Sequence, residues 1–134
     1  MNTIRRFISD NRVRAVVDWA DANPNVEQDE WARHATHYRV TLKCGRRQMT
    51  TPWSQGSAIT REPSAADVLD CLASDAVGIE NASSFEEWCA EYGYDSDSRK
   101  AERIFQTCTR QSADLKALVG EDAYRTLLWD TERL

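Results

Sequence analysis

The sequence predicts an α+β domain in which a short antiparallel β-hairpin packs against four to five α-helices. Apolar and polar residues alternate over 36–53, which is typical of strands with one buried face. Apolar residues recur every three or four positions over 1–24 and 64–129, which is typical of amphipathic helices. Because the chain has 134 residues, we expect a single domain, 1–134, with one hydrophobic core.

The N-terminal segment is predicted to be helical in one or two pieces. Ile4, Phe7 and Ile8 share one helical face. The same spacing continues in a second group of apolar residues, Val13, Val16, Val17 and Ala20. Pro24 ends the segment, because proline lacks the amide hydrogen that a helix needs.

The hairpin is predicted from two runs of alternating residues joined by a glycine turn. Over 36–43, three apolar residues share one face, namely Tyr38, Val40 and Leu42. Gly45 can adopt the positive φ that a tight turn requires, and 48–53 returns as a second strand. Pro52 confines this second strand to a sheet edge or to its own end. Residues 54–63 are expected to form a loop.

The C-terminal part is predicted to contain several capped helices. Ser64 and Ser84 are each followed three residues later by an acidic residue, as in a capping box. Gly93 is expected to end the helix that Ser84 begins. The longest helix starts after 95–98 and ends at Gly120, and a short final helix follows.

Composition bounds the class of protein. Hydrophobic residues make up 41% and charged residues 29% of the chain, which is close to the globular average and excludes a disordered protein. No apolar run approaches the roughly 18 residues of a membrane-spanning helix. Arg5 and Arg6 are not followed by the apolar stretch of a signal peptide. We therefore expect a cytoplasmic protein without a membrane partner.

The cysteines and histidines give no metal-site pattern. The four cysteines are far apart in sequence, and we expect reduced, metal-free thiols and no cofactor. Three of them are predicted to lie on apolar helix faces, namely Cys71, Cys89 and Cys108. His34 and His37 are an odd number of positions apart in a strand pattern, so they are predicted to point to opposite faces.

No catalytic motif is recognisable either. The serines and cysteines lack a glycine-framed nucleophile elbow. A pair of Asp or Glu residues leaves no local spacing signature, so a hydrolase or transferase stays a third hypothesis. The sequence favours a protein that is not an enzyme.

A binding surface is predicted around the hairpin. Its polar side and tip carry four basic residues, and two tryptophans flank it. These candidate partner-binding residues are Arg39, Lys43, Arg46, Arg47, Trp31 and Trp53. They can form a solvated hairpin tip, or they can contact an acidic protein or a nucleic-acid backbone. The other tryptophans are predicted to lie on apolar faces, namely Trp19, Trp88 and Trp129.

The net charge of −5 opposes general affinity for phosphate backbones. We therefore expect no tight direct binding to DNA. The basic N-terminal segment is a local exception, with Arg5, Arg6, Arg12 and Arg14.

Several stretches resemble a known group of proteins. They are 38–49, 52–56, 66–75, 85–89 and 93–101. Together they are similar to small uncharacterised accessory proteins of bacteriophages and prophages, and the resemblance spans about 38–120. Since that group has no assigned activity, it implies no catalytic residue.

The resemblance implies a protein that binds and inhibits a host defence complex, in the manner of an anti-CRISPR protein. The alternative is a phage regulatory or nucleic-acid-associated protein that uses the basic N-terminal helix. A homodimer formed through an exposed hairpin edge is a further expectation.

Overall fold

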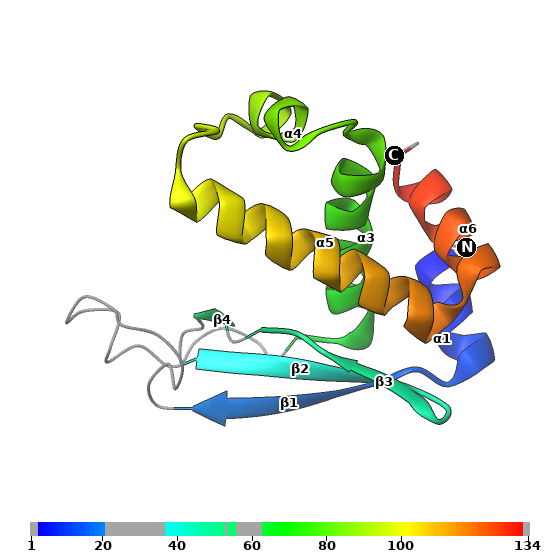
Figure 1. The fold of residues 1–134 in the computed structure, drawn as a ribbon. Helices are drawn as coiled ribbons and strands as arrows, with labels where there is room; N and C mark the ends of the chain where they lie inside the picture. The colour runs from blue at the N-terminus through cyan, green and yellow to red at the C-terminus, as the bar shows by residue number, and fades with distance from the viewer. Residues whose placement is uncertain (1–2, 21–36, 53, 56–62, 133–134) are drawn as a thin grey trace.

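The computed structural model describes residues 3–20, 37–52, 54–55 and 63–132. Within them, an antiparallel sheet forms one layer and helices cover one of its faces (Figure 1). This arrangement confirms the predicted α+β class. The elements are α1 (Thr3–Asn11), β1 (Arg14–Ala20), β2 (His37–Cys44), β3 (Arg47–Thr50), β4 (Ser54–Gln55), α3 (Ala65–Asn81), α4 (Phe85–Tyr92), α5 (Arg99–Val119) and α6 (Glu121–Glu132).

The predicted hairpin is formed by β2 and β3. Cys44 pairs with Arg47, and Gly45 has a φ of +64° in the tight turn between them. β3 ends just before Pro52, as the missing amide hydrogen of proline requires. The chain then pairs with β2 again through β4, a short strand within the predicted loop.

β1 lies on the other side of β2, so the described sheet order is β1-β2-β3. The helical prediction for 13–20 is wrong here. Val13 and Val17 fit a helical repeat, but together with Ala15 they also fit a period of two. All seven residues of β1 pair with β2. Cross-strand hydrogen bonding therefore selects the strand over the helix.

α1 ends where the chain turns toward the sheet. Arg12 has a φ of +52°, in the left-handed region. The amide of Val13 donates to the carbonyl of Ile8 at 3.0 Å, which is the six-to-one hydrogen bond of a Schellman motif. Val13 is buried. The hydrogen bond at the end of α1 thus holds Val13, the buried residue that directly precedes β1, in place.

The predicted helix caps are present. Ser64 and Asp67 form a reciprocal capping box at the start of α3. The Ser84 hydroxyl accepts the Glu87 amide at 3.1 Å, although the Glu87 carboxylate turns to Ser83 rather than to the cap residue. Gly93 ends α4 with a φ of +75°. α3 continues five residues beyond the expected end at position 76, to Asn81.

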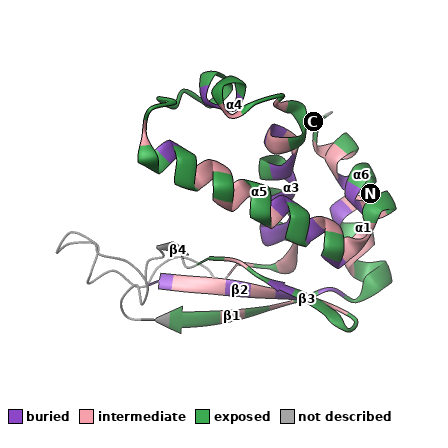
Figure 2. Cartoon of the chain, in the orientation of Figure 1, coloured by how far each residue is buried: buried purple, intermediate pink, exposed green. Residues whose placement is uncertain are grey.

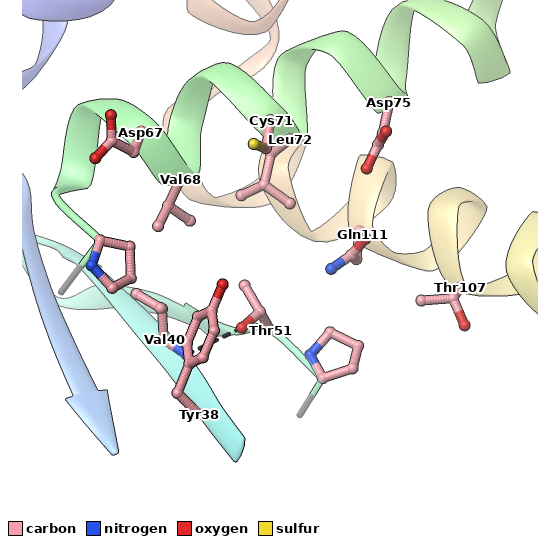
Figure 3. Close-up of a pocket in the computed structure, with 12 residues that line it drawn as sticks. Tyr38, Val40, Thr51, Asp67, Val68, Cys71, Leu72, Asp75, Thr107 and Gln111 are labelled. Carbon is pink, nitrogen blue, oxygen red and sulfur yellow. Dashed lines mark hydrogen bonds between the residues drawn. The ribbon is translucent and has the colours of Figure 1, made fainter. Parts of the chain in front are cut away.

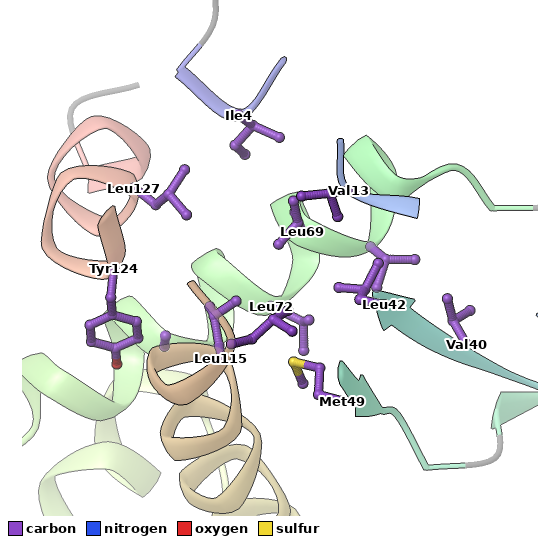
Figure 4. Packing of buried hydrophobic residues seen from close by; sticks show 13 residues of the cluster. Ile4, Val13, Val40, Leu42, Met49, Leu69, Leu72, Leu115, Tyr124 and Leu127 are labelled. Atoms are coloured by element: carbon purple, nitrogen blue, oxygen red, sulfur yellow. The ribbon is translucent and has the colours of Figure 1, made fainter. Parts of the chain in front are cut away.

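The main core lies between the helix layer and the inner face of the sheet (Figure 4). Leu42 of β2, Leu69 of α3 and Leu115 of α5 are fully buried. The four residues predicted to form the buried stripe of α3 are all buried, namely Val68, Leu69, Leu72 and Ala76. α1 and α6 close one end of this core through Ile4 and Leu127.

A second, smaller core joins α4 to α5. Trp88, Cys89 and Ala101 are buried there. Tyr92 reaches across to α3, where Gly78 leaves space for its ring. A Cβ atom at position 78 would lie 2.4 Å from the Tyr92 hydroxyl oxygen. The missing side chain of Gly78 therefore lets α4 approach α3.

Three residues predicted to be buried lie at the surface. Trp19 is 42% and Trp129 is 60% exposed, and Cys71 is exposed as well. Trp19 and Trp129 lie near the ends of β1 and α6. In α3, Cys71 precedes the buried Leu72. Spacing alone does not distinguish a residue at the border of an apolar helical stripe from a residue at the centre of that stripe.

The core predicts a large difference between two adjacent residues of α3. We expect Leu69→Ala to lower the free energy of unfolding by about 2–5 kcal/mol, since it leaves a cavity among fully packed side chains. Asp70→Ala, at an exposed site of the same helix, should change it by less than about 0.5 kcal/mol. Urea denaturation of both variants measures this, and similar losses for the two would contradict the described burial.

Candidate binding surface

The face of the sheet opposite the helices is open among the described residues (Figures 1 and 2). The register places every second residue of each strand there. One row crosses the face from Asp18 to Arg39, and the next joins Val16 to Thr41. The sequence predicted a polar outer side for β2, and Arg39, Thr41 and Lys43 confirm it. His37, which was expected on that side, is 3% exposed.

Basic residues gather at the end of this face that lies next to the hairpin turn. Arg14 of β1 lies directly opposite Lys43 of β2. Arg46 follows in the exposed turn, and Arg47 begins β3, where its pairing with Cys44 places its side chain on the helix side of the sheet. The three residues Arg14, Lys43 and Arg46 are called the basic end below. The structure therefore joins an arginine of the N-terminal segment to the hairpin cations, which the sequence had suggested as two separate surfaces.

The charges of the basic end are poorly compensated. Within the described part of the chain, Arg14, Lys43 and Arg46 form no ion pair. Like charges directly opposite each other in a sheet destabilise the pair by up to about 1 kcal/mol. An anionic group placed over this row would remove the repulsion and gain attraction from both cations.

Arg47 is held against the helix layer. Its Nη1 donates to the carbonyl oxygen of Ala117 at 3.5 Å, near the C-terminus of α5. A cation is favourable there because the last carbonyls of a helix carry partial negative charge. Asp114 lines the shallow hollow beside it. Arg47 thus links the hairpin to α5 on the helix side of the sheet.

Arg39 does not belong to this cluster, contrary to the prediction. It lies four residues along β2 from Lys43, roughly 13 Å away in an extended strand. Its Nε donates to the Asp18 carboxylate at 3.2 Å, so its charge is largely compensated. The predicted residues Trp31 and Trp53 lie outside the described residues.

The sequence missed a groove between the inner face of the sheet and the helices (Figure 3). Its volume is about 500 Å³. Tyr38 and Val40 line it from β2, while Cys71 and Asp75 line it from α3, one helical turn apart. The surrounding protein desolvates Asp75 and raises its carboxyl pKa. The spacing of Asp67, Cys71 and Asp75 every four residues could have indicated a shared face, because i and i+4 residues of a helix are neighbours.

The thiols near this groove are poor nucleophiles at neutral pH. Burial, reinforced by the Asp75 carboxylate, raises the pKa of Cys108 to about 11. Burial and nearby carboxylates, first Asp75 and then Asp70, also raise the pKa of Cys71. Since the thiolate is the reactive form, both side chains are mostly protonated at pH 7. All four cysteines are free thiols.

Among the described residues, no group of three or more His, Cys, Asp or Glu side chains could hold a metal ion. His34 lies outside them. None of the described helices has both the length and the apolar character needed to cross a membrane. Comparisons with models of protein families, with curated proteins and with solved structures found no match.

Cys108 lies near the Asp75 carboxylate of the groove, and the raised pKa of the Cys108 thiol predicts a pH-dependent reactivity. Alkylation should accelerate by about tenfold per pH unit up to a pH near the pKa of about 11, because the thiolate fraction rises in that way. Asp75→Asn should lower this pKa and speed alkylation at pH 8. The pKa should stay above its ordinary value of 9.0, since burial is the larger cause of the shift.

Mass spectrometry of the Cys108 peptide after timed iodoacetamide treatment measures the rates. Asp70→Asn removes a carboxylate that acts on Cys71 but not on Cys108, so it is the matched control. Equal acceleration of Cys108 in both variants would contradict the assignment of Asp75 as its charged neighbour.

Proposed function

We propose that this protein acts by binding a protein complex through the basic end of its sheet, and that it is a phage-encoded, non-enzymatic inhibitor of a bacterial defence complex, similar to an anti-CRISPR protein. In this proposal the protein works in the cytoplasm of the host bacterium. Its partner presents an acidic surface that covers Arg14, Lys43 and Arg46, and the bound protein blocks a step of the complex by occupying that surface.

The observation that carries the proposal is the uncompensated row of Arg14 and Lys43 on an open sheet face. Repulsion between the two cations disfavours the free state by a small amount. An acidic partner removes that repulsion, so part of the binding free energy comes from relieving the repulsion between Arg14 and Lys43 in the free protein. Charged surfaces of opposite sign also accelerate association.

The shape of the surface supports a protein partner. The open face is flanked by an exposed turn, and the apolar Val16, 42% exposed on the border strand β1, lies between the rows of Arg14 and Asp18. A polar rim around a small apolar centre is the usual composition of a protein interface. The resemblance of 38–120 to small phage accessory proteins supports a host complex as the partner.

The second candidate is a nucleic-acid-associated phage protein. One observation favours it: Arg14 from the N-terminal segment lies beside Lys43, so the cations available to a phosphate backbone form one surface. The net charge of −5 opposes it, because the rest of the chain repels phosphates. Tight and salt-sensitive binding of the unmodified protein to naked duplex DNA would replace the first proposal by this one.

We predict that neutralising the two exposed cations of the hairpin weakens partner binding by at least about tenfold, because charged groups buried at an interface often contribute more than about 1 kcal/mol each. The variant carries Lys43→Gln and Arg46→Gln. Pull-down from a bacterium with a complete CRISPR system identifies the partner, and binding to the purified complex then gives the Kd.

The matched control removes two exposed cations of α5 by Arg99→Gln and Arg103→Gln. It lowers the net charge equally but leaves the sheet unchanged, so it should bind as the unmodified protein does. Circular dichroism checks that both variants are folded. If the control loses affinity as much as the hairpin variant does, net charge rather than the basic end governs binding.

A further inference from the structure

The outer edge of β1 is unpaired among the described residues. β1 is a border strand of the sheet, and no helix or strand drawn in colour lies beyond it in Figure 1. It has seven residues, whereas the opposite edge is divided between the shorter β3 and β4. A long open edge offers unsatisfied backbone donors and acceptors to another strand.

The hydrogen bonding of β2 shows which backbone groups of β1 face this edge. The amide of Thr51 donates to the carbonyl of Val40 at 2.8 Å, so Val40 directs its backbone toward β3. By alternation, Thr41 directs its backbone toward β1 and bonds with Val16, its partner in the register. The residues on either side of Val16, namely Ala15 and Val17, therefore direct their amides and carbonyls outward.

We propose that the outer edge of β1 binds β1 of a second copy of this chain, antiparallel and with the two-fold axis at Val16. Ala15 of one copy then exchanges both backbone hydrogen bonds with Val17 of the other, twice about the axis. Val16 meets its own counterpart. The inference goes beyond the proposed function and does not rest on it.

Charge complementarity selects this register. With the axis at Val16, Arg14 of each copy lies opposite Asp18 of the other. These are non-hydrogen-bonded pairs, in which the side chains approach most closely. With the axis at Val17, Arg14 would instead face Ala20, and Val16 would face Asp18. Of these two registers, only the one with its axis at Val16 places Arg14 opposite Asp18 and Val16 opposite Val16 of the second copy.

The same register relieves the repulsion on the open face. In one copy, Arg14 lies beside Lys43 without an ion pair to a described residue. In the dimer, it lies between Lys43 and the incoming Asp18 carboxylate. The exposed Val16 side chain, 42% accessible in the single chain, is covered by the other valine. Lys43 and Arg46 stay uncovered on both copies, so the acidic partner of the proposed function meets these two cations in the dimer and Arg14 only in the single chain.

The variant Arg14→Asp should weaken the dimer without weakening the fold of the single chain. Within one chain, the new carboxylate lies opposite Lys43, so the monomer gains a favourable pair. Across the edge, it faces Asp18, so two attractive pairs become repulsive. We expect the dimer dissociation constant to rise by at least about tenfold. Sedimentation equilibrium over a range of concentrations measures this constant for the unmodified protein and the variant.

Mixing two variants tests the register itself. Asp18→Arg removes the ion pair with Arg39 within its own chain. Across each edge it brings two arginines together, so it should also be monomeric. An equimolar mixture of the Arg14→Asp and Asp18→Arg proteins places opposite charges in both pairs. The mixture should therefore form a heterodimer, which native mass spectrometry distinguishes by mass. Circular dichroism of each variant alone confirms that it is folded.

Arg46→Asp is the control, because it makes the same change in net charge at the hairpin turn and should dimerise as the unmodified protein does. Three results would overturn the inference. They are an unmodified protein that is monomeric at every concentration, an Arg14→Asp protein that dimerises with unchanged affinity, and a mixture of the two charge variants that stays monomeric.

Discussion

Burial of one sheet face under a single layer of helices is the constraint on which the rest of this molecule depends. β2 supplies the two least exposed sheet side chains, Val40 and Leu42, and these pack against Leu69 and Leu115. A chain of this size can bury a core without disulfides, and here one helical layer completes it. The second face of the sheet is consequently left to water or to a partner, and the strand register decides which side chains it presents.

Electrostatics follow from the same arrangement. The hairpin turn and the start of β1 meet at one end of the sheet, where Arg14 and Lys43 face each other. Two rows away, Asp18 compensates Arg39. A net acidic protein thus concentrates its uncompensated positive charge on one small region. This separation of positive from negative charge orients an acidic partner before contact, because the negative remainder of the surface repels that partner.

The sequence predicts the parts of the fold that local patterns determine. Ser64 and Gly93 mark helix ends through caps that involve only nearby residues, and Gly45 marks the turn of the hairpin in the same way. β1 could not be predicted, because its apolar residues fit two periods and the partner that decides between them lies more than 15 residues away in sequence.

The candidate surface was predicted in part for the same reason. Lys43 and Arg46 are neighbours in one hairpin, so the sequence places them together. Arg14 joins them only through the pairing of β1 with β2, and Arg39 leaves them because the strand is extended. The groove of Cys71 and Asp75 depends on how α3 lies over the sheet, which no local spacing determines.

The contact between α1 and α6 has a consequence for how the chain folds as it leaves the ribosome. Ile4 is buried in the same core as Leu127, and the Thr3 hydroxyl donates to the Asp130 carboxylate. The packing of α1 is thus incomplete until α6, which follows much later in the chain, has been synthesised. Until α6 emerges, α1 has only part of its apolar covering, so a nascent chain exposes Ile4 to chaperones and to other nascent chains.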